Sequence, residues 1–411
     1  MNDPRKTIVV TGVGVVSPYG IGMDRLQAGV LSGKCCLEPT KDLYPGFAGS
    51  TAQVPDLPLP AEGSRSRYSR SDRLAMVAAR DAVSPLGEST TYRESGVVMA
   101  STVAGVSEID PEIVDNPAAW YRRGGLARAA TYPAAHVADA VGEDLGAYGP
   151  RCAVSAACAS GAMAIALAAN LLLDGAAPMM LAGGSDALCP FTLSGFNSLQ
   201  ALDPEPCRPF DQNRKGLNLG EGAAVLVLET LDRAVARHAQ VLAVLRGWAL
   251  TNDAFHSTAP HAQGNGLADC MRLAMEMAGV GREQIGYVNA HGTGTPLNDI
   301  AESNAYEAVF GGRSQPVPVS STKSYFGHCL GAAGALEAAI TIAAVRCGAL
   351  LPTLRLTDPI ESASVNWLRG EVLRQKLPLA MSVSAGFGGS NAALIFGNSE
   401  YGDGGFRDGR S

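Results

Sequence analysis

Continuously apolar, β-branched runs that alternate with helix-like stretches constrain this chain more than any other feature. Residues 7–16 (TIVVTGVGVV) lack the polar alternation of a strand that has one face in water. Similar strands are expected at residues 96–101, 179–183, 223–229 and 241–250, and again at 380–385 and 392–396. Helices are expected at residues 73–83, 159–173 and 266–278. This order predicts an α/β fold with largely parallel or mixed sheets.

The bulk composition excludes several classes of protein. Hydrophobic residues make up 46% of the 411 residues and charged residues only 17%, which excludes a disordered or fibrous chain. The net charge of −7 argues against a general affinity for nucleic acid or anionic membranes. Nine cysteines without CxxC pairs give neither a disulfide framework nor a zinc signature. Residues 162–173 are too few to span a bilayer, so we expect a cytoplasmic protein without a membrane span.

The segment VSAACASGAMAIALAA (residues 154–169) places Cys158 between a strand-like end and an Ala-rich helix. A thiol at a helix N-terminus lies near unpaired backbone N–H groups and the positive end of the helix dipole, and both lower its pKa. We therefore expect a reactive thiolate whose small neighbours leave it accessible. Position alone does not exclude a buried structural cysteine, the usual role of a free cysteine.

Two glycine-rich loops in the second half of the chain each carry a histidine. The first, VNAHGTGTPLNDIAE (residues 288–302), leads from a short apolar strand through His291 into a Gly-Thr-Gly-Thr loop. The second, SSTKSYFGHCLGAAGALE (residues 320–337), places His328 five residues after Lys323 and before a glycine-rich helix start. Glycines let the backbone approach a ligand closely. Each loop alone is also consistent with a purely structural role.

A nucleophilic cysteine and two histidines form a suitable set for acyl transfer. The thiolate attacks a thioester, and the imidazoles stabilise an oxyanion or move protons. A Cys/His hydrolase needs one histidine with an orienting carboxylate or amide, so two histidines on glycine-rich loops fit a hydrolase less well. No zinc-ligand spacing links these residues, and we expect no metal.

Taken together, these segments resemble the β-ketoacyl synthases (ketosynthases), in the elongating branch of the thiolase superfamily. The resemblance covers nearly the whole chain, from TGVGVVSPYG through CRPFDQNRKGLNLGEGAAVLVLE (residues 207–229) to SAGFGGSNAALIF (residues 384–396). It implies a thiolase-like α/β fold, a five-layered αβαβα sandwich of two similar halves. We place the N-terminal half, with the nucleophilic cysteine and cap insertions, at residues 1–238, and the C-terminal half, with both histidines, at residues 239–411.

The resemblance implies an acyltransferase, a 3-oxoacyl-[acyl-carrier-protein] synthase of fatty acid or type II polyketide biosynthesis. Cys158 would carry the acyl chain as a thioester. His291 and His328 would assist decarboxylation of the malonyl unit and stabilise the enolate that it leaves. Lys323 matches the family lysine that orders this site, and Glu337 matches the usual ionic partner of that lysine.

Further residues match supporting positions of the family. Asp299 matches a structural acid that follows the His-Gly-Thr loop. Thr293 and Thr295 match threonines that hydrogen-bond the pantetheine arm of the substrate. Phe387 matches a mobile gating phenylalanine, and its backbone N–H would form the oxyanion hole together with that of Cys158.

The resemblance also implies an acyl carrier protein as partner and acyl and malonyl thioesters as substrates. The carrier would supply phosphopantetheine, and no permanently bound cofactor is expected. The chain would form a homodimer, or a heterodimer with a related ketosynthase-like subunit. We interpret a group of arginines as a surface that docks the acidic carrier by charge complementarity: Arg65, Arg67, Arg70, Arg73 and Arg208. A solvated basic helix start is the alternative.

The substrate and the role of the chain in an assembly stay open at this level. The segment SAACASG departs from the family, which more often has Thr before Ala-Cys and Ser after Ala-Ser, and this points to a specialised acyl pocket. The alternative function is a ketosynthase-like acyltransferase or a non-elongating subunit of a hetero-oligomeric synthase. Cysteine rather than glutamine at position 158 argues against the chain-length-factor subunits, and the complete cysteine, histidine and lysine set favours elongation.

Overall fold

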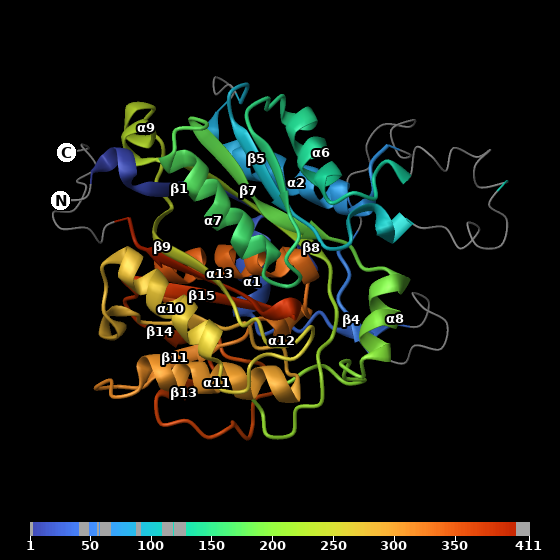
Figure 1. Cartoon of the computed structure of the whole chain (residues 1–411), viewed down its shortest axis with the longest axis vertical. Helices are drawn as coiled ribbons and strands as arrows, with labels where there is room; N and C mark the ends of the chain where they lie inside the picture. Colours follow the sequence, from blue (N-terminus) through green and yellow to red (C-terminus); the bar gives the residue numbers. More distant parts are fainter. Residues whose placement is uncertain are drawn as a thin grey trace.

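Two blocks of five strands with the same strand order form the frame of this computed structural model (Figure 1). The structure describes residues 3–40, 49–55, 57, 67–87, 92–108, 118 and 129–399, so Arg65 lies outside the described residues. The N-terminal block contains β1 (Ile8–Ser17), β5 (Gly96–Ala100), β6 (Arg151–Val154), β7 (Met179–Asp186) and β8 (Gly222–Thr230). The C-terminal block contains β9 (Ala243–Asn252), β10 (Val288–Asn289), β11 (Val317–Ser320), β15 (Leu379–Gly386) and β16 (Ser390–Gly397).

Both blocks have the order 3-2-4-5-1 when their strands are numbered along the chain: β6-β5-β7-β8-β1 and β11-β10-β15-β16-β9. The strand directions agree as well. In each block the first two neighbouring pairs are parallel and the last two are antiparallel. A short antiparallel ladder between residues 8–10 of β1 and 243–245 of β9 joins the blocks. The mixed sheets expected from the sequence are thus confirmed.

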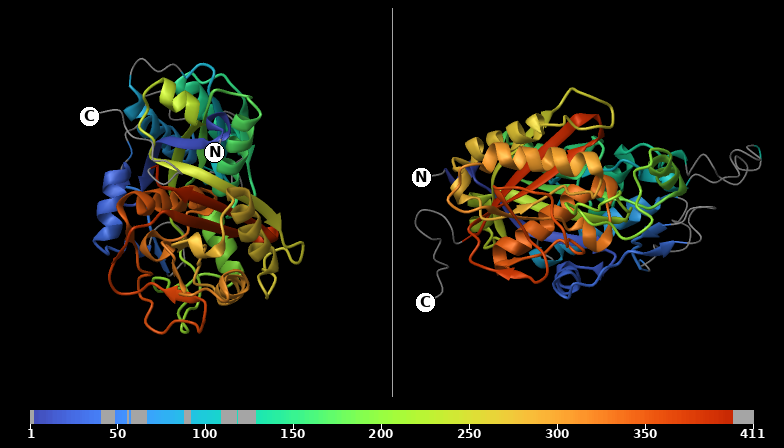
Figure 2. Two further views of the ribbon diagram at one scale, coloured as in Figure 1. Left: turned by 90° about the vertical axis from the view of Figure 1, so that its left-hand side faces the viewer. Right: turned by 90° about the horizontal axis from the view of Figure 1, so that it is seen from below.

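Helices cover both faces of each block and complete five layers. Helices α2 (Arg70–Val83) and α6 (Ala135–Leu145) pack on the outer face of the N-terminal block. Helices α7 (Ser160–Leu173) and α13 (Ala333–Cys347) lie between the two blocks and contact each other. Helices α10 (Asn265–Ala278) and α11 (Pro296–Phe310) cover the outer face of the C-terminal block, as the right-hand view of Figure 2 shows. The αβαβα sandwich implied by the family resemblance is the observed fold.

Shorter elements lie around this frame. Helix α8 (Pro190–Ser198) follows β7, α9 (Leu231–Ala236) connects the two blocks, and α12 (Lys323–Phe326) follows β11. The remaining α-helix in the described part of the chain is α1 (Met23–Leu31). The remaining described strands are β2 (Gly20–Ile21), β3 (Glu38–Thr40), β4 (Gly49–Thr51), β12 (Ala349–Leu350), β13 (Val365–Trp367) and β14 (Leu373–Arg374).

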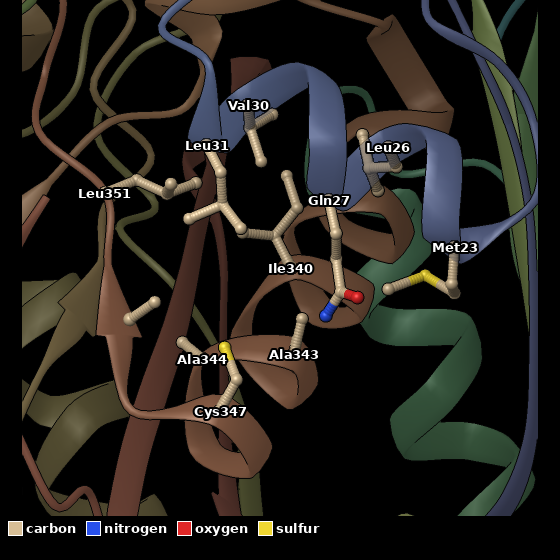
Figure 3. Close-up of a pocket in the computed structure, with 11 residues that line it drawn as sticks. Met23, Leu26, Gln27, Val30, Leu31, Ile340, Ala343, Ala344, Cys347 and Leu351 are labelled. Atoms are coloured by element: carbon tan, nitrogen blue, oxygen red, sulfur yellow. The ribbon is translucent and has the colours of Figure 1, made fainter. Parts of the chain in front are cut away.

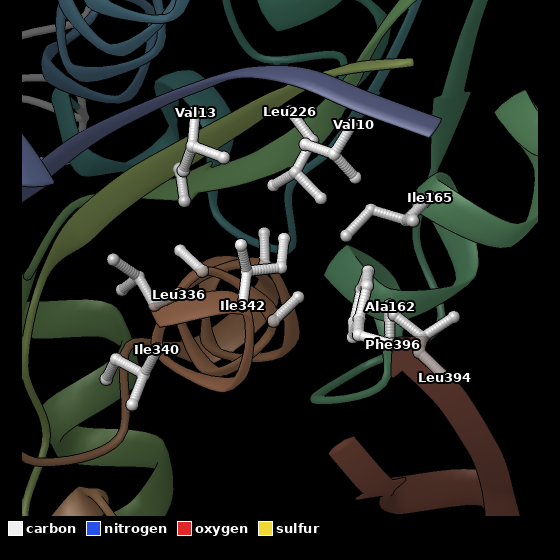
Figure 4. Close-up of a cluster of buried hydrophobic side chains, with 14 of the residues drawn as sticks. Val10, Val13, Ala162, Ile165, Leu226, Leu336, Ile340, Ile342, Leu394 and Phe396 are labelled. Atoms are coloured by element: carbon white, nitrogen blue, oxygen red, sulfur yellow. The ribbon is translucent and has the colours of Figure 1, made fainter. Parts of the chain in front are cut away.

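The central layer forms the largest hydrophobic cluster. Figure 4 shows Leu336 and Ile342 of α13 between Val10 of the N-terminal block and Phe396 of the C-terminal block, with Ile165 of α7 beside them. A helix that is apolar all round needs apolar neighbours on every side. The stretch Leu330–Cys347 is long and apolar enough to cross a membrane, but 89% of it is buried inside the protein. We therefore assign it as a core helix.

Helix α1 covers the side of α13 that faces away from the sheets. Leu26 and Val30 of α1 lie opposite Ile340 and Ala344 of α13, across an apolar gap of about 20 Å³ (Figure 3). This volume is far below the roughly 300 Å³ at which small-molecule pockets begin. The gap is a packing imperfection of the central layer.

Glycines within β1 let α2 lie directly on the strand. A Cβ atom at Gly14 would come within 2.0 Å of the Ala78 carbonyl oxygen and 2.2 Å of the Ala82 backbone nitrogen. We expect Gly14→Ala to lower the free energy of unfolding by about 1–3 kcal/mol, because α2 must move away. Gly195→Ala is the matched control, since a Cβ on that helical glycine meets no atom within 4 Å. Urea denaturation of both variants measures the difference, and equal stability would contradict the close contact.

Candidate active site

Cys158 lies in the turn between β6 and α7. The turn places Ala157 in the left-handed region (φ 48°), a conformation that costs an alanine roughly 1–3 kcal/mol. The Ser160 hydroxyl stabilises this turn because it accepts a hydrogen bond from the Ala156 backbone N–H at 2.7 Å. The strained turn directs the thiol away from α7 toward the C-terminal half, where it lines a pocket of about 370 Å³.

The protonation state of this thiol corrects the expectation drawn from its helix position. Cys158 is 8% exposed, and burial raises the pKa of its thiol to about 11. The charge of Lys323 and the backbone N–H of Phe387 lower the pKa, but burial outweighs both. The resting group is therefore a neutral thiol rather than the thiolate expected from the helix N-terminus.

His291 lies two residues after the end of β10 and lines the same pocket. The Lys323 ammonium donates to the His291 carbonyl oxygen at 2.6 Å and lies 3.3 Å from its Nδ1 atom. An ammonium can only donate, so His291 Nδ1 is an acceptor and the ring proton of the neutral imidazole is on Nε2. Burial first, and then the charge of Lys323, lower the pKa of His291 well below its ordinary value.

His328 has the same tautomer for a different reason. Its Nδ1 atom accepts the backbone N–H of Leu330 at 3.0 Å, which leaves the proton on Nε2. Within the described residues, this buried Nε2 has no hydrogen-bond partner. Burial and Lys323 also lower the pKa of His328 well below its ordinary value. Both histidines therefore present a neutral Nε2–H donor.

The sequence prediction that Lys323 and Glu337 pair is seen directly in the geometry. Their side chains form a buried ion pair, and each is 2% exposed. Burial raises the pKa of Glu337 to about 7, although the neighbouring Lys323 opposes that shift. Because Lys323 also contacts His291, the pair fixes a positive charge behind the imidazole rather than in the pocket.

The Cys158 sulfur and one ring nitrogen of each histidine lie within 4.8 Å of one another. This spacing alone resembles a metal site. The hydrogen bonds of the two rings distinguish a site for a metal ion from a site for an anionic oxygen. A metal-bound Nε2 requires the proton on Nδ1, but His328 Nδ1 faces the Leu330 N–H, and His291 Nδ1 faces the Lys323 ammonium. The two rings are therefore built to donate to an anionic oxygen beside the thiol, and they do not fit a cation.

Phe387 begins a Phe-Gly-Gly turn, and its backbone N–H lies near enough to the Cys158 sulfur to lower the pKa of the thiol. Its half-buried ring lies 5.7 Å from that of Phe196. A second loop holds the turn: the Asp253 N–H donates to the Gly389 carbonyl at 2.8 Å, and the Asn391 amide donates to the Asp253 carboxylate at 2.8 Å. The sequence reasoning missed Asp253, which no local pattern distinguishes from an ordinary loop acid.

Thr293 and Thr295 line the pocket, and their hydroxyls lie 2.9 Å apart. Asp299 supports them, since its carboxylate accepts from the Gly294 N–H at 3.2 Å and from the Phe210 N–H at 2.8 Å. Burial raises the pKa of Asp299 above its ordinary value, and these hydrogen bonds oppose that shift. The acid thus fixes the backbone of the threonine loop.

Glu302 is a second supporting acid, and the sequence reasoning gave it no role. Its carboxylate accepts the backbone N–H groups of His291 at 2.7 Å and Gly292 at 2.8 Å, and the Tyr306 hydroxyl at 2.6 Å. Burial raises the pKa of Glu302 to about 7. The signal was present in the sequence, because Glu302 follows Asp299 by one helical turn, and both therefore face the loop.

Asp186 at the end of β7 supports the other histidine loop. It is fully buried, and it accepts the Ser101 hydroxyl at 2.5 Å, the Val103 N–H at 2.9 Å and the Gly331 N–H at 2.7 Å. The last contact ties the start of the helix after His328 to the N-terminal half. Nothing in the sequence around Asp186 had indicated this role.

The described arginines of the predicted docking group have different ion-pair partners. Arg70 is partly exposed and forms an ion pair with the buried Glu221. Arg73 is half-buried on the same helix. Arg67 pairs at the surface with Glu143 at 3.1 Å. Arg208 lies beside the threonine loop and pairs with Glu205 at 2.8 Å.

Two family profiles together match most of the chain. The profile of the Beta-ketoacyl synthase, N-terminal domain matches residues 5–234, and that of the Beta-ketoacyl synthase, C-terminal domain matches residues 242–357. The chain is 34% identical to 3-oxoacyl-[acyl-carrier-protein] synthase 2 of Coxiella burnetii, over 95% of this chain and 98% of that protein. It is also 34% identical to the chloroplastic 3-oxoacyl-[acyl-carrier-protein] synthase I of Arabidopsis thaliana, over 96% and 87% of the two chains.

Solved structures extend the likeness. The ishigamide ketosynthase/chain length factor superposes with a TM-score of 0.89 at 31% identity, covering 96% of this chain and 99% of that one. A β-ketoacyl synthase from Burkholderia phymatum superposes with a TM-score of 0.86 at 32% identity, covering 95% and 99%. With both family profiles matched and these relatives aligned over almost their full length, the chain belongs to the β-ketoacyl synthase family of acyltransferases.

Proposed function

We propose that this chain catalyses decarboxylative Claisen condensation of a Cys158-bound acyl group with a malonyl thioester carried by an acyl carrier protein. One observation carries the proposal: the Cys158 sulfur and one ring nitrogen of each histidine lie within 4.8 Å of one another in one pocket, and each imidazole carries its proton on Nε2. A thiol alone would suffice for acyl transfer. Two donors aimed at one point beside it serve a second reaction in which an oxyanion forms.

In the first half-reaction the Cys158 sulfur attacks the carbonyl carbon of the acyl thioester. The backbone N–H groups of Cys158 and Phe387 would hold the resulting oxyanion, because the Phe387 N–H lies near the sulfur and the Cys158 N–H belongs to the residue that carries it. The sulfur of the pantetheine arm then leaves as the carbonyl group reforms. It takes up the proton that Cys158 loses, so acyl transfer consumes no net proton even though the resting thiol is neutral.

In the second half-reaction the malonyl thioester loses CO2. The electron pair of the broken carbon–carbon bond forms an enolate, and its oxygen would accept from His291 Nε2–H and His328 Nε2–H. The enolate carbon attacks the Cys158 thioester, the carbon–sulfur bond breaks, and the cysteine regains one proton from solvent. The products are CO2 and a β-ketoacyl thioester two carbons longer than the acyl group. Burial and, after it, the charge of Lys323 lower the pKa of both imidazoles and favour the neutral form, which is the form that donates here.

The test is carbon–carbon bond formation by the unmodified protein. We expect release of CO2 and a product longer by two carbons when acyl and malonyl carrier thioesters are supplied together, measured by mass spectrometry of the carrier. Acylation of Cys158 without CO2 release would favour the alternative, a ketosynthase-like acyltransferase or a non-elongating subunit. A panel of acyl starters in the same assay determines chain length and separates a fatty acid role from a polyketide role.

Partners and location are part of the proposal. A related solved complex is described as a type II polyketide acyl-carrier protein with its ketosynthase bound to the hexaketide, and other neighbours pair a ketosynthase with a chain length factor. By likeness, we place an acyl carrier protein with its phosphopantetheine arm, and a ketosynthase-like dimer partner, with this chain. Its nine free cysteines are consistent with the cytoplasm. The halves 1–238 and 239–411 would supply the nucleophile and the two imidazoles, respectively.

Charge reversal tests the carrier surface. We expect Arg208→Glu combined with Arg67→Glu to lower kcat/KM for carrier-bound substrate by about three- to tenfold at low salt, since both face an acidic partner in this proposal. Turnover of a free pantetheine thioester stays unchanged. Arg272→Glu on α10 is the matched control, because its surface ion pair with Asp269 lies on another helix. An equal loss with both substrates, or no salt dependence, would contradict docking at these residues.

The pH dependence of decarboxylation follows from the lowered histidine pKa values. An imidazole with the ordinary pKa of about 6.5 is about 90% protonated at pH 5.5. The folded pKa values of His291 and His328 lie well below that, so the neutral, donating form persists as the pH falls through 6.5. We expect CO2 release by Cys158→Ala protein to change by less than about twofold between pH 7.5 and 5.5. A fall of about tenfold or more over this range would show that the imidazoles titrate normally, whereas a smaller inflection near pH 7 would belong to Glu302 and Glu337.

A further inference from the structure

Asn298 lies in the first turn of α11 and lines the active-site pocket with Thr293 and Thr295. Its side-chain nitrogen donates to the Asp299 carboxylate at 3.2 Å and to the Glu302 carboxylate at 3.3 Å. These are the two acids that hold the threonine loop and the His291 loop. The Asn298 amide therefore joins the supports of both loops.

The orientation of this amide is fixed by its neighbours. Each contacted atom, Asp299 Oδ1 and Glu302 Oε2, already accepts a backbone N–H, from Gly294 and Gly292 respectively. Such oxygens need a donor, so the nitrogen of Asn298 must face them and Oδ1 must point the other way. Within the described residues, no hydrogen bond reaches this Oδ1, and the half-buried side chain lines the pocket. The result is a rigidly held acceptor at the pocket wall.

The thioester arm proposed for this pocket contains two amides, and each amide N–H needs an acceptor once the pocket takes it out of water. The threonine hydroxyls nearby are suited to donate to the amide carbonyls. We propose that Asn298 Oδ1 accepts an amide N–H of the arm, which makes Asn298 a specificity-determining residue for amide-containing thioesters. This inference rests on the proposed use of a pantetheine-type thioester.

The test pairs a change in the protein with a change in the substrate. The substrates are an acyl-pantetheine and two analogues in which one amide N–H is replaced by an ester oxygen, and the readout is the rate of Cys158 acylation by intact-protein mass. For the unmodified protein we expect a three- to tenfold lower kcat/KM with one analogue, the usual effect of one neutral hydrogen bond. Asn298→Ala loses the same factor with the amide substrate and becomes indifferent to that replacement.

A merely structural role gives a different result. If Asn298 only supports Asp299 and Glu302, Asn298→Ala slows all three substrates equally and keeps the full preference for the amide, and this outcome would overturn the proposal. Indifference of the unmodified protein to both replacements would overturn it as well. Asn304→Ala is the matched control on the same helix, since its amide bonds to the Ala262 carbonyl at 2.9 Å outside the pocket lining. Because acylation precedes condensation, failure of carbon–carbon bond formation remains a separate result.

Discussion

Cys158→Ala eliminates condensation, with a loss of at least about 1,000-fold, whereas CO2 is still released from the malonyl thioester. The acyl group has no other attachment point in the pocket, since Cys158 supplies the only sulfur among its lining residues in the part of the chain that the structure describes. The two imidazole donors do not depend on the sulfur. Product analysis by mass spectrometry and CO2 release from the same sample measure the two activities together.

The control for this variant is another cysteine outside the pocket. Cys347→Ala at the exposed end of α13 should acylate and condense like the unmodified protein. Intact-protein mass then locates the acyl adduct. An adduct that persists in Cys158→Ala would show a different nucleophile. Simultaneous loss of CO2 release would show that the thiol takes part in decarboxylation and that the two half-reactions are not separable.

His328→Ala should lose the activity that Cys158→Ala keeps. We expect CO2 release to fall by about 100- to 1,000-fold, while Cys158 still accepts an acyl group. The variant removes the Nε2–H that has no partner in the described protein and is free to bind the enolate oxygen. It also deprives the Leu330 N–H of its acceptor, so folding has to be checked by circular dichroism. Stopped-flow CO2 detection and intact-protein mass give the two rates.

His328→Asn separates chemistry from folding. An asparagine retains an N–H donor at roughly the same reach, so we expect it to recover part of the CO2 release that alanine loses. His238→Asn, in the left-handed turn after α9, is the matched control and should leave both activities unchanged. Equal CO2 release by His328→Ala and the unmodified protein would remove His328 from the proposed mechanism.

The long buried strands and helices were predicted well from the sequence, because they consist of uninterrupted apolar runs. Strand β6 was predicted only as a strand-like end before Cys158, without bounds, since its four residues include an arginine and are only partly buried at the sheet edge. Helix α2 begins at Arg70 rather than at residue 73 because Ser69 and Asp72 form a capping box. Local capping of this kind extends a helix beyond its apolar pattern.

The residues that react were predicted better than the acids that support them. Motif resemblance found Cys158, His291, His328 and Lys323, which the fold brings together from three separate segments. It could not reveal Asp253 or Asp186, because the partners that tie them to the site, Asn391 and Gly331, lie 138 and 145 residues away along the chain. The resting pKa of Cys158 was also predicted in the wrong direction. A sequence shows the helix that follows a thiol, but the loss of hydration that raises the pKa depends on three-dimensional burial.

The repeated strand order has an evolutionary consequence. Helix α7, which follows the third strand of its block, carries the nucleophile at its start, and α13, which follows the third strand of the other block through α12, is preceded by Lys323 and His328. The two loops thus hold equivalent places in the repeated strand order, and Cys158 and His328 meet in one pocket. An ancestral pair of identical single-block subunits would place the same residue on both sides. Gene duplication and fusion removes this constraint, so that one loop can specialise as nucleophile and the other as hydrogen-bond donor.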